Sequence, residues 1–134
     1  MNLEDQKQYI RTFASLFFVL QGAGAAAWWI TILGFPKIRE FFVPIGVPFA
    51  SLLSLLPGDL ILYVVGSLAS AYGLLTRKRW VWPLMCVHAG ATAYAALYAI
   101  MLPMLLSCCK LGAILMLPSL ALPLYFAWRL RPRA

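Results

Sequence analysis

The sequence predicts an all-α protein, a four-transmembrane-helix bundle with a proline-rich outer connection between helices one and two. Four apolar stretches fill almost all of the 134 residues, and each reaches the about 20 residues that a helix needs to cross a bilayer. The chain is 63% hydrophobic and 11% charged, with mean hydropathy +0.86. We therefore expect one integral membrane domain over residues 1–134. The spans are Phe13–Leu33, Leu52–Leu75, Val81–Leu102 and Leu111–Trp128.

The first stretch follows Lys7 and Arg11 and ends in Trp28-Trp29. Tryptophans are common at membrane–water interfaces, so this pair is predicted to mark the outer interface. The run of glycine and alanine over residues 22–27 favours close approach of a neighbouring helix.

The connection that follows, residues 34–58, contains four prolines but is otherwise largely apolar. Because proline interrupts regular helix, we expect a short interfacial helix near Lys37–Val43, then a bend, and a half-helix at Leu52–Leu56 before Pro57. We expect this connection to fold over the outer mouth of the bundle. The alternative is a loop that rests on the lipid headgroups.

The remaining connections are short. Thr76–Trp80 predicts an antiparallel hairpin of spans two and three, and a second turn is predicted around Pro103–Lys110. Pro118 and Pro123 fall inside span four, and each is expected to kink it or to free a carbonyl.

Charge predicts the orientation. Of the 11 basic residues, eight lie before span one, between spans two and three, or after span four, and three lie on the other side. Cytoplasmic loops carry the Lys/Arg excess, so both termini are predicted to be cytoplasmic. Membrane lipids with anionic headgroups are the expected partners of these charges, and no nucleic acid is expected.

Polar residues inside the spans are the best pointers to function. Gln21 and His88 lie at matching depths, about 14 and 12 Å from the inner surface, and each has small neighbours. We predict that the two side chains meet, directly, through one water or around a ligand's polar group. Thr92 shares the helix face of His88 and joins the candidate ligand-binding residues. The structural alternative is a hydrogen-bonded histidine with no ligand.

Three further candidates for ligand binding are Asp59, Tyr63 and Tyr98. Asp59 follows Pro57-Gly58, which favours a carboxylate that caps a helix start, with a proton or ligand site as the alternative. Tyr98 and Asp59 are expected near the outer end, where they are candidates to line a pocket. Interface anchoring also explains Tyr98.

Cysteine and histidine spacing predicts no metal site. Cys86 lies about 20 Å along the bundle axis from the adjacent pair Cys108 and Cys109, too far for a disulfide, and a bridge between neighbours would be strained. We expect free thiols. The sequence identifies no catalytic residue and no cofactor.

Span two carries a family resemblance. Gly66-Ser67 followed by Gly73-Leu74-Leu75-Thr76-Arg77 resembles the DoxX-like family of small four-helix membrane proteins, whose second helix often ends in a glycine pair followed by Leu-Gly-Leu-Leu-Thr-Arg. Arg11, Gly22 and Gly46-Val47-Pro48 are also similar, so the resemblance covers roughly the first 80 residues. It implies a four-helix bundle linked to membrane redox and quinone-coupled reactions. Tyr63 stands where the family often has a glutamate.

Three function hypotheses follow. The first is a non-catalytic bundle that binds an apolar or lipid-like ligand, or serves as an accessory subunit of a larger membrane complex. The second is a small-solute transporter or channel that works as a homo-oligomer, since four helices enclose little volume. The third is a membrane enzyme acting on a lipid-like substrate or quinone, with His88 and Asp59 as acid–base groups. The different depths of these two residues argue against the third.

Overall fold

The computed structural model describes residues 3–39, 48–106 and 110–132. It is all-α, and four of its helical segments are long and apolar enough to cross a membrane: Glu4–Gly34, Phe49–Leu75, Val81–Met101 and Lys110–Arg129. The fold class predicted from the sequence is confirmed. The elements are α1 (Leu3–Gly34), α2 (Pro36–Arg39), α3 (Phe49–Leu53), α4 (Leu56–Gly58), the π-helix η1 (Asp59–Val65), α5 (Gly66–Leu75), α6 (Val81–Leu106) and α7 (Lys110–Arg129).

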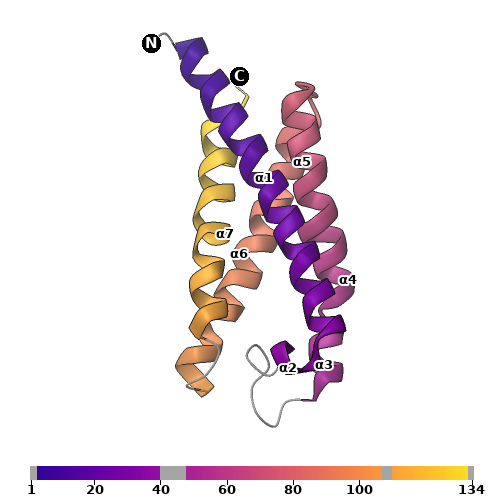
Figure 1. Ribbon diagram of the computed structural model, residues 1–134. Coiled ribbons are helices and arrows are strands. Elements are labelled where there is room, and N and C mark those ends of the chain that lie inside the picture. Colours follow the sequence, from indigo (N-terminus) through magenta and orange to yellow (C-terminus); the bar gives the residue numbers. More distant parts are fainter. Residues whose placement is uncertain (1–2, 40–47, 107–109, 133–134) are drawn as a thin grey trace.

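The four long segments form two pairs, α1 with α5 and η1, and α6 with α7. The start of α1, the turn between α5 and α6, and the end of α7 lie at one end of the molecule, at the top of Figure 1, while α2 and α3 lie at the other. We call the first end the basic end, because Arg11, Arg77, Lys78 and Arg79 gather around one cavity there. Helices α1 and α7 approach each other near the basic end and separate toward the opposite end (Figure 1).

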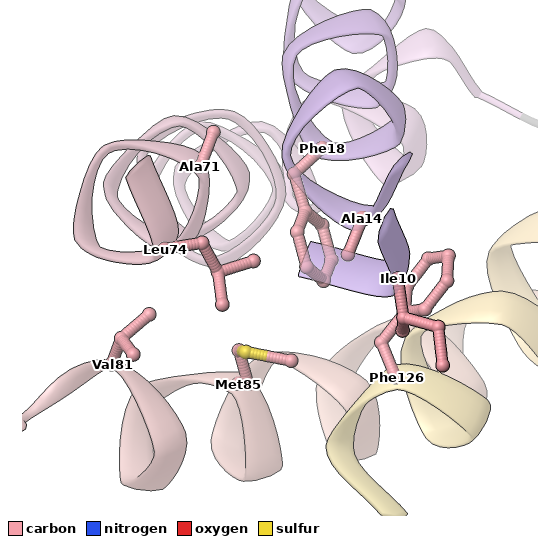
Figure 2. Close-up of a cluster of buried hydrophobic side chains, with 8 residues drawn as sticks. All are labelled: Ile10, Ala14, Phe18, Ala71, Leu74, Val81, Met85 and Phe126. Carbon is pink, nitrogen blue, oxygen red and sulfur yellow. The ribbon is translucent and has the colours of Figure 1, made fainter. Parts of the chain in front are cut away.

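The apolar core lies in the half of the bundle next to the basic end. All four long segments contribute to it, as Figure 2 shows: Ile10, Ala14, Phe18, Ala71, Leu74, Val81, Met85 and Phe126. The Phe126 ring stands edge-on to Phe13 and Phe18, with centroids 5.9 Å apart in each pair. In lipid, close packing of this kind stabilises the association of helices, because the hydrophobic effect that stabilises the core of a soluble protein is absent.

The predicted hairpin of spans two and three is present, and Gly73 makes it tight. A Cβ at this position would lie 2.8 Å from Val81 Cβ and 3.0 Å from Trp80. Any larger side chain here would therefore have to push the start of α6 away from the end of α5.

The first connection is shorter than the sequence predicted. Helix α3 begins at Phe49 rather than Leu52, and Pro57 lies in the first turn of α4 without ending the helical path. The half-helix predicted before Pro57 is present as α3, with other bounds, and ends at Leu53. The helical path resumes at Leu56, because proline is tolerated in a first turn, where its missing N–H is not needed. A short helix is present over Pro36–Arg39, where an interfacial helix near Lys37–Val43 was predicted. Residues 40–47, and with them the predicted cover of the bundle mouth, lie outside the described part of the chain.

Prolines in the other helices do not divide the elements that contain them, and a kink at Pro118 or Pro123 stays a prediction. Helix α6 continues through Pro103 to Leu106, and α7 runs through Pro118 and Pro123 as one element. Neighbouring helices and local adjustments satisfy the freed backbone groups in such helices. Cys86 has a free, exposed thiol, while Cys108 and Cys109 lie outside the described residues.

Trp29 packs inside the bundle. Its side chain is only 2% exposed, and its indole N–H donates to Asp59 Oδ2 over 3.1 Å. A buried indole N–H needs an acceptor, and Asp59 supplies one. The position of Trp29 at the outer interface stays a prediction. Trp80, just before α6, and Trp128, near the end of α7, are exposed.

Candidate functional site

A cluster of three polar side chains joins α1, α5 and α6 in the interior of the bundle. His88 Nε2 lies 3.1 Å from Gln21 Oε1 and 3.2 Å from Ser67 Oγ. Ser67 Oγ also donates to Gln21 Oε1 over 3.3 Å. His88 and Ser67 are almost completely buried. The direct contact of Gln21 with His88, predicted from matching depths, is therefore present. We call these three residues the polar cluster.

Backbone geometry in span two fixes the position of His88. Its Nδ1 donates to the Leu62 carbonyl oxygen over 2.8 Å, and Leu62 belongs to η1, where the hydrogen-bond pattern changes from i→i+4 to i→i+5. Gly66 provides the space, because a Cβ there would lie 3.0 Å from His88 Nδ1. The π-helix and the glycine together form the recess that holds the imidazole.

This geometry limits how protons are arranged in the polar cluster. Nδ1 carries a hydrogen, since a carbonyl can only accept, so Nε2 of the neutral ring is an acceptor. Gln21 Oε1 is also an acceptor, and two acceptors do not bond. Two arrangements satisfy the contact: an imidazolium that donates from both nitrogens, or a rotated Gln21 amide whose NH₂ faces His88. Ser67 fits either one, because its hydroxyl donates or accepts.

Aromatic rings and a second polar group surround the cluster. Phe18 and Tyr63 stand edge-on to the imidazole, with centroids 5.4 and 6.1 Å away. The Tyr63 hydroxyl lies beside the Gln21 and Ser119 side chains and donates over 3.4 Å to the thioether of Met116, a weak acceptor. Among the described residues, Gln21 Nε2 is buried and has no hydrogen-bond partner.

The Asp59 carboxylate does not cap the start of a helix, which corrects the interpretation favoured from the sequence. Its backbone is helical, it follows α4 without a break into η1, and its side chain caps no N–H group. The carboxylate instead accepts from Trp29 and so links α1 to span two. The reason is the helical turn that begins at Leu56, before the proline.

The other two candidates lie apart from this arrangement. Thr92 is fully buried on the cluster side of α6, but its hydroxyl donates to Ala89 O of its own helix over 3.2 Å. Tyr98 is 53% exposed and takes no part in the hydrogen bonds of the described residues around Asp59. The outer pocket of Tyr98 and Asp59 stays a prediction, because residues 40–47 of the connection that would complete it lie outside the described part of the chain.

Ser67 and the Leu62 carbonyl were missed by the sequence analysis. A depth argument would have found Ser67, because it lies nine residues before Thr76, or about 14 Å along its helix, level with Gln21. The contact of His88 with the Leu62 carbonyl depends on the π-helix, and no residue type in the sequence predicts a π-helix.

The arrangement offers hydrogen-bonding groups rather than a metal centre. Within residues 3–39, 48–106 and 110–132 there is no group of three His, Cys, Asp or Glu side chains that could hold a metal ion. His88 and Asp59 bond to different partners, so they are not joined as an acid–base pair.

Comparison with known proteins gives no assignment, because no family model, curated protein or solved structure matches this chain. The resemblance to DoxX-like proteins is therefore not confirmed as a family relationship, although four long apolar helices are consistent with a small four-helix membrane protein.

Proposed function

We propose that this multi-pass membrane protein binds an amphipathic, lipid-like ligand within the bundle, as a non-catalytic binding protein or accessory subunit. The ligand's polar group would lie beside Gln21 and Tyr63. Its apolar part would contact the large apolar side chains of the surrounding helices.

One observation carries this proposal: in the arrangement where Gln21 Oε1 accepts from an imidazolium at His88, the buried Gln21 amide nitrogen has no partner in the described part of the chain. Such a donor in a hydrocarbon environment is costly until it meets an acceptor. A ligand carbonyl or hydroxyl beside Gln21 would accept from it, and the Tyr63 hydroxyl, now bonded to a thioether, would supply a second donor. A ligand whose headgroup carries an oxygen acceptor would satisfy the Gln21 amide and the Tyr63 hydroxyl.

The resemblance of span two to DoxX-like proteins supports one class of ligand. That family is linked to quinone-coupled reactions, and a quinone has carbonyl acceptors on an apolar tail. Catalysis is not part of the proposal, since Asp59 and His88 bond to different partners.

A pair of matched tyrosine variants tests ligand binding. The protein is purified in mild detergent, and binding of a short-chain ubiquinone is measured by quenching of tryptophan fluorescence. We expect Tyr63→Phe and Gln21→Leu each to weaken binding about tenfold, the value of one lost hydrogen bond to a buried group. Tyr94→Phe is the control, because Tyr94 is 77% exposed.

Equal affinities for the wild type and all three variants would contradict the proposed site. Proteoliposome uptake of a small solute by an oligomer, with a polar path lined by several copies, would favour the transporter hypothesis instead.

We further propose that the basic end faces the cytoplasm, as the excess of basic residues there favours. After Cys86, Cys108 and Cys109 are replaced, a cysteine at exposed position 78 should be labelled from the inside and one at exposed position 37 from the outside. Reversed labelling would contradict this orientation.

A further inference from the structure

A cavity of about 160 Å³ lies at the basic end, between α1, the α5–α6 turn and the end of α7. Its rim is basic and its floor is apolar. Figure 2 shows three of the floor side chains, Leu74, Val81 and Met85, turned toward one another. The charged residues that line it are Arg11, Arg77, Lys78 and Arg79, and no carboxylate is among its lining residues.

Two of these guanidinium groups are already held together. Gln8 Oε1 accepts from Arg77 Nη2 over 3.0 Å and from Arg11 Nη1 over 3.3 Å. One amide oxygen thus joins two cations, one from α1 and one from the α5–α6 turn, without neutralising either. Each guanidinium keeps further N–H donors, and the pair is arranged in advance for an anion that can use them.

Backbone conformation gives an independent reason to single out Arg77. The end of α5 is a Schellman motif, in which Lys78 N donates to Gly73 O over 2.9 Å and Arg77 N to Leu74 O over 3.3 Å. Arg77 occupies the left-handed position of this motif, with φ of 54°. Glycine is usual there because it has no Cβ. An arginine at this position costs conformational energy, and its side chain supplies a contact to α1 that glycine lacks.

We propose that this cavity binds a phosphate ester, namely the headgroup of an anionic phospholipid. Phosphate oxygens match the fork of donors on Arg11 and Arg77. Trp82 also lines the cavity, and the exposed Trp80 lies beside the turn. These tryptophans put the site at the headgroup level, where the apolar floor meets the glycerol and the first methylene groups of a lipid. The proposal is independent of the ligand proposed for the bundle interior.

The neighbouring cavity of about 280 Å³ is a poorer anion site. Arg11 and Arg77 line it too, but Glu4 and Asp5 share its surface. Their negative charge opposes an anion there, so the phosphate group is assigned to the smaller cavity.

The test compares lipids bound to the full chain by native mass spectrometry in detergent, with equal amounts of phosphatidylglycerol and phosphatidylcholine. We expect the wild type to retain phosphatidylglycerol selectively. Arg77→Asn should reduce that retention about tenfold, since it removes a charge-assisted contact, and asparagine tolerates a positive φ. Arg11→Gln, which leaves the turn unchanged, should have the same effect.

Arg131→Gln is the matched control, because exposed Arg131 lies at the same end but does not line the cavity. It should leave retention unchanged. Equal losses in Arg131→Gln and Arg77→Asn would overturn the proposal and indicate a general effect of surface charge. Retention of phosphatidylcholine as strong as that of phosphatidylglycerol would also overturn it. Displacement of the lipid by inorganic phosphate at equal concentration would overturn the lipid as the source of the phosphate.

Discussion

Two glutamines on the same helix make similar bonds in opposite surroundings. Gln8, exposed near the start of α1, bonds to Arg77 and Arg11. Gln21, deeper in the same helix, bonds to Ser67 and His88. Each amide oxygen has two partners. Gln8 connects α1 to the α5–α6 turn, and Gln21 connects α1 to α5 and α6. The two sites therefore have similar hydrogen bonds and differ mainly in burial, so a comparison of them isolates the effect of the surroundings.

Access to water determines how much each set of hydrogen bonds contributes to stability. At Gln8, water competes for every donor and salt screens the charges, so exposed contacts of this kind contribute little to stability. Around Gln21 no water competes, and a group left without a partner loses its full hydrogen bond. The buried cluster should therefore hold the fold, while the exposed bridge orients cations and leaves the stability almost unchanged.

Loss of His88 should be the largest effect. His88→Leu removes the imidazole that bonds to the Leu62 carbonyl and leaves Ser67 and Gln21 only their bond to each other. We expect it to lower the free energy of unfolding by about 2 to 3 kcal/mol, measured by thermal unfolding in detergent. Val87→Leu, at an exposed position of the same helix, is the control. Gln21→Leu combined with His88→Leu should cost less than the sum of the single changes. Additive costs would show that the two side chains do not interact.

A change at Gly66 tests the recess that holds the imidazole. Gly66→Ala should displace His88 from the Leu62 carbonyl, because the new Cβ would lie 3.0 Å from Nδ1. The control is Gly24→Ala, where the Cβ meets nothing within 4 Å and only helix propensity changes. Relative to that control, we expect a loss of about 1 to 2 kcal/mol in the same unfolding assay. Equal stabilities of the two alanine variants would contradict the recess.

The Trp29–Asp59 bond should fall between the two glutamines in value, because Asp59 is only partly buried. Trp29→Phe keeps a ring and removes the N–H, and we expect a cost of about 1 kcal/mol in chemical unfolding. With Asp59→Leu already present, the same change should cost less, since the carboxylate is gone. An unchanged cost would mean that the tryptophan acts through packing alone.

Gln8→Ala should give the smallest effect, below about 0.5 kcal/mol, as expected for an exposed site. Gln21→Ala in the same assay provides the comparison. Equal costs for the two glutamines would remove the distinction between them.

Much of the fold was predictable because the membrane imposes it. Length and hydropathy specify four spans, and helical rise alone brought Gln21 to the depth of His88. The same reasoning was wrong where a local detail decided. Asp59 looked like a cap because proline and glycine precede it, but a turn beginning at Leu56 had already started the helix. The residue type of Trp29 also did not show that its side chain is buried against a carboxylate, Asp59.

The π-helix η1 has a consequence for the phase of span two. Each of its i→i+5 bonds encloses one residue more than an α-helical bond, so the faces before and after Asp59–Val65 are rotated relative to those of a continuous α-helix. Asp59 meets Trp29 on α1, while Gly66 faces His88 on α6. The number of residues in this segment thus sets which neighbouring helix each half of span two contacts. Removal of one residue would rotate one half relative to the other and change these contacts, which no single substitution could do.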